Sequence, residues 1–295
     1  MNKFVFLLFL PLCSLAKIQV AATTTDVAAI VREVGGNQVD VFHIAKGTQD
    51  PHQIEAKPSY MVKLRPVDLV IAQGLELETA WLTPLIEGSR NEKLLQKNNV
   101  MELGPMLDPI DIPKGTISRA DGDVHPGGNP HFQLDPVRVG KAAVLIADRL
   151  AQSDPGHTTL FNENAKKFNQ HMIDKTAEWK KRLAKTGVKE LITYHKYLAY
   201  FCSRFDLVCN LQLEPKPGIP PTANHLLSVI SEIKKRNISL VLIENLYLDD
   251  AGNKLKQDVP NLKIQKIPVS VEGDTGITTN DQLIEKIVTT IEAAK

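Results

Sequence analysis

Short runs of apolar and β-branched residues alternate with longer amphipathic stretches along most of this chain, and this alternation constrains the fold most strongly. Such an alternation is typical of parallel α/β architecture. The first half contains four expected strands, at 18–22, 39–44, 68–72 and 100–103, and the second half contains four more, at 190–193, 207–213, 240–243 and 264–267. Four strands in each half predict two similar α/β lobes.

One long helical stretch separates the two halves. Asp154 is a suitable N-cap, Pro155 stands at the first helical position, and Gly187 ends the segment. A helix of this length, at ~1.5 Å per residue, would span roughly 45 Å, enough to run along both lobes. Its apolar residues recur at steps of three or four or their multiples and form one stripe: Phe161, Ala165, Phe168, Met172, Trp179 and Leu183.

The N-terminus has the features of a signal peptide. The apolar run 4–12 is too short to be a stable membrane anchor, and Ser14-Leu15-Ala16 offers the small residues that a signal peptidase recognises. Cys13 raises the alternative of a lipid anchor, but the two residues before it are not small. We therefore expect a periplasmic or otherwise extracytoplasmic protein with four parts: a signal peptide (1–16), an N-terminal lobe (17–153), a connecting helix (154–187) and a C-terminal lobe (188–295).

Charge and composition exclude some classes of partner. The chain has 35 basic and 34 acidic residues, so it lacks a strong field that would attract nucleic acid or an anionic membrane. With 43% hydrophobic and 23% charged residues, it has the composition of a globular protein, and no later run is long enough to span a bilayer. We expect a monomer that does not bind nucleic acid.

Two cysteines follow the signal peptide, Cys202 and Cys209. In an oxidising compartment, such a pair can form a disulfide that closes a short loop and stabilises the protein modestly. The alternative is two buried thiols that act as small hydrophobic side chains. We expect the disulfide.

Three histidines occupy distinctive loops: His52 in Asp50-Pro51-His52, His131 in Asn129-Pro130-His131, and His195 directly after Tyr194. Ligands of open parallel sheets bind beyond the carboxyl ends of the strands, where His52 and His195 are expected. Neutral imidazoles on separate loops suit a transition metal, above all zinc. Two ligands from the first lobe and one from the second predict a metal site in the cleft between the lobes.

These segments, in this order, resemble the zinc- and manganese-type solute-binding proteins of bacterial ABC importers. The resemblance also includes the opening 17–24, Gly35-Gly36 and the Glu-Pro-Lys-Pro-Gly-Ile-Pro-Pro segment at 214–221, and it runs through nearly the whole mature chain. It implies an extracytoplasmic protein, not an enzyme, that captures a divalent metal and passes it to a membrane permease. It also implies that the connecting helix is a rigid element that limits hinge closure.

The fourth ligand is where this chain departs from the family's pattern. A closed zinc site needs four ligands, and many relatives supply an aspartate late in the second lobe, whereas the stretch 268–274 here does not align clearly with it. Glu244 directly follows the apolar run 240–243 and is our first choice. The remaining candidates, in order, are Asp274, Glu214 and Glu272, and a water molecule is the last alternative.

Other polar residues could support the site. Asp50 and Asp135 could accept the second N–H of a metal-bound imidazole, although both could instead form a cap or turn. His125 lies in a polar, glycine-rich loop, where it is either a recruitment ligand on a flap or simply exposed, and the segment 115–128 could hold a second, weaker metal. The other histidines of the mature chain are interpreted as structural or exposed: His43, His157, His171 and His225.

Ligand type favours zinc as the cargo, because manganese prefers a shell richer in oxygen than three imidazoles provide. A manganese carrier is therefore the second choice. A zinc-dependent hydrolase is the alternative from another class, since three histidines and a water also form a catalytic zinc site. However, the chain has no HExxH sequence and no nucleophile elbow. An adhesin built on the same scaffold makes no distinct sequence prediction.

Overall fold

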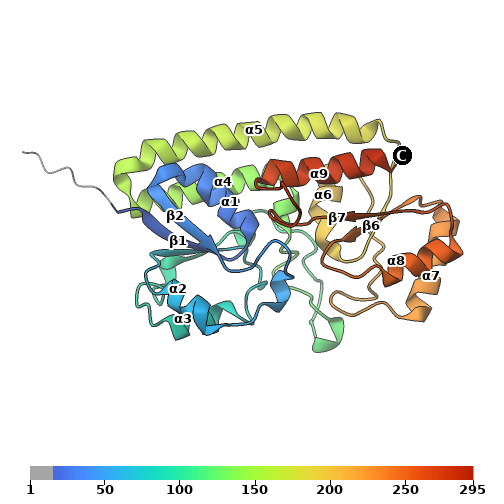
Figure 1. Ribbon diagram of the computed structural model, residues 1–295, viewed down its shortest axis with the longest axis horizontal. Coiled ribbons are helices and arrows are strands. Elements are labelled where there is room, and N and C mark those ends of the chain that lie inside the picture. Colours follow the sequence, from blue (N-terminus) through green and yellow to red (C-terminus); the bar gives the residue numbers. More distant parts are fainter. Residues whose placement is uncertain (1–15, 295) are drawn as a thin grey trace, which may run out of the picture.

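The computed structural model describes residues 16–294, so Cys13 and the expected signal peptide, apart from Ala16, lie outside the described residues. Two parallel sheets lie side by side beneath one long helix (Figure 1). The first sheet has the order β2-β1-β3-β4 and the second has the order β5-β6-β7. The strands are β1 (Ile18–Ala22), β2 (Val39–His43), β3 (Leu69–Ala72), β4 (Val100–Glu102), β5 (Ile192–Thr193), β6 (Leu240–Glu244) and β7 (Lys263–Ile267). The expected two-lobe parallel α/β fold is confirmed.

The expected strand at 207–213 is wrong. Within the described residues, this segment makes only isolated bridges beside β5, between Glu190 and Val208 and between Thr193 and Gln212. The segment lies at the edge of the second sheet with much of one face in solvent, and Val208 is 42% exposed. An edge segment with so little burial gains too little from pairing to form a continuous ladder, so this sheet has three strands.

Helices cover both faces of each sheet. They are α1 (Thr25–Gly35), α2 (Pro58–Leu64), α3 (Leu82–Ser89), α4 (Pro136–Ser153), α5 (Thr158–Ala184), α6 (Ala199–Arg204), α7 (Ala223–Arg236), α8 (Asp250–Asp258) and α9 (Asn280–Ala293). In the first sheet, α1, α4 and α5 pack on one face and α2 and α3 on the other. In the second sheet, α5, α6 and α9 share a core on one face and α7 and α8 pack on the other. Within residues 16–294, no helix is both long and apolar enough to cross a membrane.

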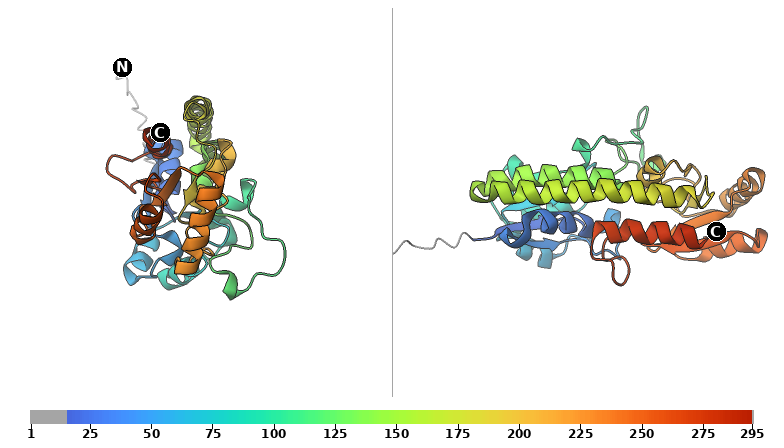
Figure 2. Two further views of the ribbon diagram at one scale, coloured as in Figure 1. Left: turned by 90° about the vertical axis from the view of Figure 1, so that its right-hand side faces the viewer. Right: turned by 90° about the horizontal axis from the view of Figure 1, so that it is seen from above.

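Helix α5 runs along both halves of the molecule, with α1 and α9 end to end beside it (Figure 2). The predicted stripe of α5 is buried throughout. Its first part, from Phe161 to Met172, packs into the core of the first sheet, whereas Trp179 and Leu183 pack into the core of the second. One helix therefore belongs to two hydrophobic cores, which opposes independent movement of the lobes.

The expected start of the long helix at Asp154 is wrong. Helix α4 continues to Ser153, and a 3-10 turn at Pro155–His157 separates it from α5. The side chain of Asp154 caps no backbone amide and instead lies 2.6 Å from His157 Nδ1. Helix α4 begins at Pro136, directly after its cap Asp135.

Cys202 and Cys209 form a disulfide, as expected. It connects α6 to the edge segment beside β5. We expect the double variant Cys202→Ala/Cys209→Ala to lose about 2–3 kcal/mol of unfolding free energy, because opening so short a loop restores conformational freedom to the unfolded chain. Urea unfolding of the variant and the wild type measures this loss. Equal midpoints for wild-type protein with and without reductant would contradict it.

Candidate metal centre

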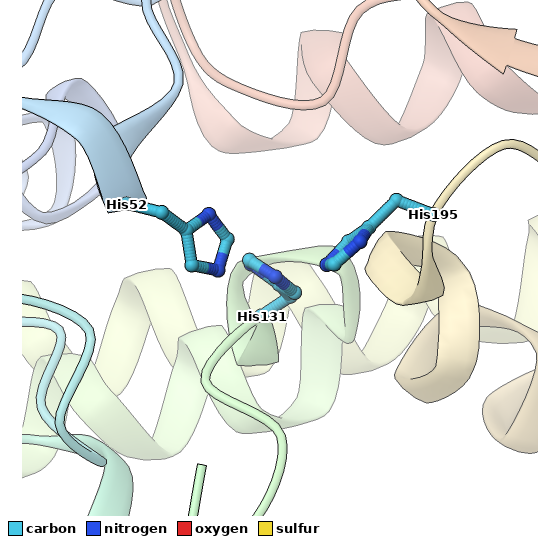
Figure 3. A group of neighbouring side chains, drawn as sticks. All are labelled: His52, His131 and His195. Atoms are coloured by element: carbon cyan, nitrogen blue, oxygen red, sulfur yellow. The ribbon is translucent and has the colours of Figure 1, made fainter. Parts of the chain in front are cut away.

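The structure brings His52, His131 and His195 together. One ring nitrogen from each histidine lies within 4.8 Å of the corresponding atoms of the other two. The ring centroids are 5.2 Å apart for His52 and His131 and 5.5 Å apart for the other two pairs. The three rings point toward one another from three separate segments (Figure 3).

Local hydrogen bonds fix the segments that carry these rings. Asp50 caps the 3-10 turn Pro51–Gln53 by accepting a hydrogen bond from the backbone N–H of His52, at 3.0 Å. Asn129 Oδ1 accepts from the backbone N–H of His131 at 2.9 Å. The side-chain nitrogen Nδ2 of Asn129 also donates to the backbone carbonyl of Lys196 at 3.0 Å. This bond connects the loop of His131 to the residue after His195. One of these three contacts therefore joins the two halves of the chain beside the rings.

The ring nitrogens are arranged for a cation. His52 Nδ1 lies 2.7 Å from Asp50 Oδ1, and His195 Nδ1 lies 2.8 Å from Glu214 Oε2. A carboxylate on one nitrogen fixes the tautomer and directs the lone pair of the other nitrogen, as at many metal sites. His52 Nε2 and both nitrogens of His131 are buried without any hydrogen-bond partner. Buried polar atoms without partners are rare, so these nitrogens mark a place where a ligand belongs.

Electrostatics keep the central ring neutral. Burial lowers the pKa of His131 well below its usual value, and the nearby His52 and His195 lower it further. Burial would raise the pKa of Asp50, but the hydrogen bond and charge of His52 hold this pKa below its usual value. A neutral imidazole beside an ionised carboxylate is the protonation state that binds a divalent metal.

The acids considered for the fourth position have other contacts. Glu244 is fully buried, and its carboxylate accepts hydrogen bonds from the backbone N–H groups of Tyr194 at 3.0 Å and His195 at 3.2 Å. Burial raises the pKa of Glu244 to about 8. Among the described residues, Glu244 lies outside the three-histidine group, and its carboxylate contacts the backbone at His195 and not the ring.

The other three acids also lie outside this group. Glu214 faces Nδ1 of His195 and also accepts from the backbone N–H of Gly218 at 3.2 Å. Glu272 and Asp274 are exposed and lie near His43 and Lys286, at 3.6 Å and 3.7 Å.

The two expected supporting aspartates differ. Asp50 contacts His52 as expected. Asp135 instead caps α4 and pairs with Arg138 and Arg204, so the capping interpretation describes this residue.

Two further residues lie against the three histidines. Tyr197 was missed in the sequence: its buried ring lies 3.9 Å from the ring of His131, and its hydroxyl donates to Asp50 at 3.4 Å. No local pattern distinguishes it from the other aromatic residues after His195. His125 is not simply exposed, because its ring lies 5.3 Å from that of His52. The remaining histidines have contacts elsewhere, with Glu272 for His43, Asp154 for His157, Asp281 for His171 and the Gln212 carbonyl for His225.

Removing the carboxylate behind His195 should weaken metal binding without unfolding the protein. We expect Glu214→Ala to lower the affinity of the site for a divalent metal on the order of 10- to 100-fold, because His195 then loses the partner that fixes its ring and tautomer. Competition with a chelator measures the affinity. Asp274→Asn, an exposed acid on the same half, is the matched control, and equal affinities in both variants would contradict the supporting role.

Comparisons with known proteins identify the family of this chain. The family described as "Zinc-uptake complex component A periplasmic" matches residues 20–294. The metal ABC transporter substrate-binding lipoprotein SsaB of Streptococcus sanguinis is 23% identical over 271 residues, which cover 89% of this chain and 84% of that protein. The manganese ABC transporter substrate-binding lipoprotein PsaA of Streptococcus anginosus is 24% identical over 247 residues, 82% of this chain and 77% of that protein.

Solved structures share the fold. A crystal structure of ZnuA superimposes with a TM-score of 0.80 at 20% identity, covering 94% of this chain and 99% of the other. A mutant of the laminin-binding adhesin Lmb from Streptococcus agalactiae gives 0.77 at 22% identity, covering 93% and 99%. The matching family is described by zinc, and the similar proteins are named for manganese, for a metal that is not specified and for laminin.

Proposed function

This chain belongs to the family of periplasmic zinc-uptake components, the extracytoplasmic metal-binding proteins of ABC importers, and we propose that its own cargo is Zn²⁺. Members of the family are binding components and not enzymes, so the hydrolase alternative is not favoured. They bind a metal ion and work with a membrane permease. The ligands we assign to the ion in this chain are His52, His131 and His195.

The observation that carries the proposal is the set of buried, unpartnered nitrogens between three converging imidazoles. Burying a polar atom without a partner costs free energy, and a cation between the rings would provide that partner. Zinc fits better than manganese because the group contains nitrogen donors and no carboxylate, whereas manganese prefers oxygen. A manganese carrier of the same type remains the second candidate, since several similar proteins are named for manganese.

The placement of the ligands also suggests how the cargo could signal its presence. We divide the chain into lobes at 17–153 and 188–295, joined by 154–187. His52 and His131 then come from one lobe and His195 from the other, so a bound ion would favour the form in which the lobes are closed. Because α5 packs into both cores, we expect this movement to be small. The permease would recognise the closed, loaded shape, and the carrier is expected to act as a monomer.

Titration of metal-stripped protein with zinc and with manganese, each in competition with a chelator, tests the proposal. We expect one zinc per chain, with a dissociation constant in about the nanomolar range, equivalent to about −12 kcal/mol, and far weaker manganese. Preferred manganese would support the second candidate. The absence of tight binding of either metal would overturn the carrier proposal itself.

A further inference from the structure

Tyr197 connects the second half of the chain to two ligands of the first half. It lies in the 3-10 turn Lys196–Leu198, two residues after His195, and its side chain is fully buried. Its ring centroid lies 3.9 Å from that of His131, 5.0 Å from that of His195 and 6.2 Å from that of His52. Together with the distances between the three imidazoles, these values place the phenol ring outside the plane of the imidazole centroids. The ring therefore covers one face of the three-histidine group.

The hydroxyl of Tyr197 has one hydrogen-bond acceptor among residues 16–294. It donates to Oδ1 of Asp50 at 3.4 Å, across 147 positions of the chain. The same oxygen lies 2.7 Å from Nδ1 of His52 and accepts from the backbone N–H of His52 at 3.0 Å. A buried hydroxyl that loses its partner costs free energy, so this bond restrains the Asp50 carboxylate. A series of contacts from Tyr197 through Asp50 therefore connects the second half to the orientation of His52.

Tyr197 is placed to orient ligands and not to control access to them. A cavity of about 60 Å³ lies beside the imidazoles, and its lining includes His131, His195 and Lys196 but not Tyr197. Removing the hydroxyl therefore leaves the walls of this cavity as they are. An effect of the hydroxyl on metal binding has to act through Asp50, the group that the hydroxyl contacts.

We propose that Tyr197 is a positioning residue of the metal site; this inference rests on the proposed function. Its hydroxyl holds the Asp50 carboxylate on Nδ1 of His52, which leaves the buried, unpartnered Nε2 of His52 to bind the ion. Its ring packs against the ring of His131 and limits the rotation of that imidazole. One turn of the second half thus follows the ligand His195 and orients both ligands of the first half.

A double-mutant cycle measures whether Tyr197 acts through Asp50. Tyr197→Phe removes the hydroxyl and keeps the ring, and we expect it to lower zinc affinity about 10-fold, the lower end of the range for a group that supports a ligand. Asp50→Ala should lower zinc affinity on the order of 10- to 100-fold. Adding Tyr197→Phe to Asp50→Ala should cause little further loss, because the hydroxyl then has no carboxylate to hold. Competition with a chelator measures the affinity of the wild type and of each variant.

Tyr247→Phe is the matched control, since it removes a hydroxyl from another tyrosine of the second half, whose ring lies 6.4 Å from that of His195. It should leave zinc affinity unchanged, both alone and in the Asp50→Ala background. Tyr197→Leu also removes the ring, so its loss should exceed that of Tyr197→Phe, and an equal loss would overturn the part assigned to the ring. Urea unfolding verifies that the metal-free variants are folded. Tyr197→Phe keeps the ring in the core and remains the test of the hydroxyl if Tyr197→Leu does not fold.

The outcomes distinguish this inference from the proposed function. Wild-type zinc affinity in Tyr197→Phe, or a loss of equal size with and without the Asp50 carboxylate, would overturn the positioning role and leave the zinc carrier standing. Failure of the wild type to bind zinc tightly would instead overturn the proposed function, and this inference with it. A loss in Tyr197→Phe that disappears in the Asp50→Ala background would establish that Tyr197 positions His52 through Asp50.

Discussion

Replacing His131 by alanine is expected to abolish tight zinc binding while the protein remains folded. His131 is 1% exposed, both its ring nitrogens lack partners, and its ring lies 5.2 Å from that of His52 and 5.5 Å from that of His195. The substitution removes one of the three assigned ligands. We therefore expect the affinity for zinc to fall by more than the roughly 100-fold that loss of a supporting residue causes. Because the ring of His131 makes no hydrogen bond, we expect the substitution to leave the protein folded.

Two measurements test this variant. Competition with a chelator measures the affinity for zinc. Thermal unfolding with and without zinc measures how much the bound ion stabilises the folded protein. For the wild type, zinc at about 1,000 times the dissociation constant should add about 4 kcal/mol to the unfolding free energy, and His131→Ala should gain almost none. His171→Ala, which removes an exposed histidine near Asp281, should behave like the wild type. Zinc-dependent stabilisation of equal size in His131→Ala and His171→Ala would disprove the assignment of His131.

Replacing Asp135 by alanine is expected to cause a large loss of stability. Asp135 is completely buried. Its carboxylate caps α4 through the N–H of Val137 at 2.9 Å and accepts from Arg204 Nε at 2.8 Å and Nη2 at 2.9 Å, in addition to Arg138. Breaking a buried ion pair by removing one partner costs about 3–5 kcal/mol, and we expect the lower end because Arg204 remains a third exposed and partly solvated.

Urea unfolding of metal-free protein measures this effect. Asp135→Asn should lose less than Asp135→Ala, because the amide oxygen can still cap α4 and accept from one arginine. Asp108→Ala is the matched control, since Asp108 pairs with Lys141 on the exposed surface near α4 and should change stability little. A loss in Asp135→Ala no larger than that in Asp108→Ala would show that the buried link between α4 and α6 is not stabilising.

Features with a local cause were predictable from the sequence. Buried strands require runs of apolar residues, and seven of the eight expected strands form. The stripe of α5 follows from helical periodicity, and the loops of His52 and His195 follow from the rule that ligands bind beyond the ends of parallel strands. The prediction of a strand at 207–213 failed because the composition of this segment is typical of a strand, whereas its exposure at the sheet edge does not support continuous pairing.

The contacts around the metal centre depend on residues that are far apart in the sequence. Glu214 reaches His195 across 19 positions, Glu244 meets the backbone of His195 across 49, and Arg204 meets Asp135 across 69. The backbone N–H of Asp123 meets the carbonyl of Pro217 only because the two lobes pack together. A local pattern specifies which segment becomes a strand, helix or ligand-bearing loop, since these depend on neighbouring residues. Which carboxylate faces which nitrogen depends on the packing of distant segments, and no local pattern contains that information.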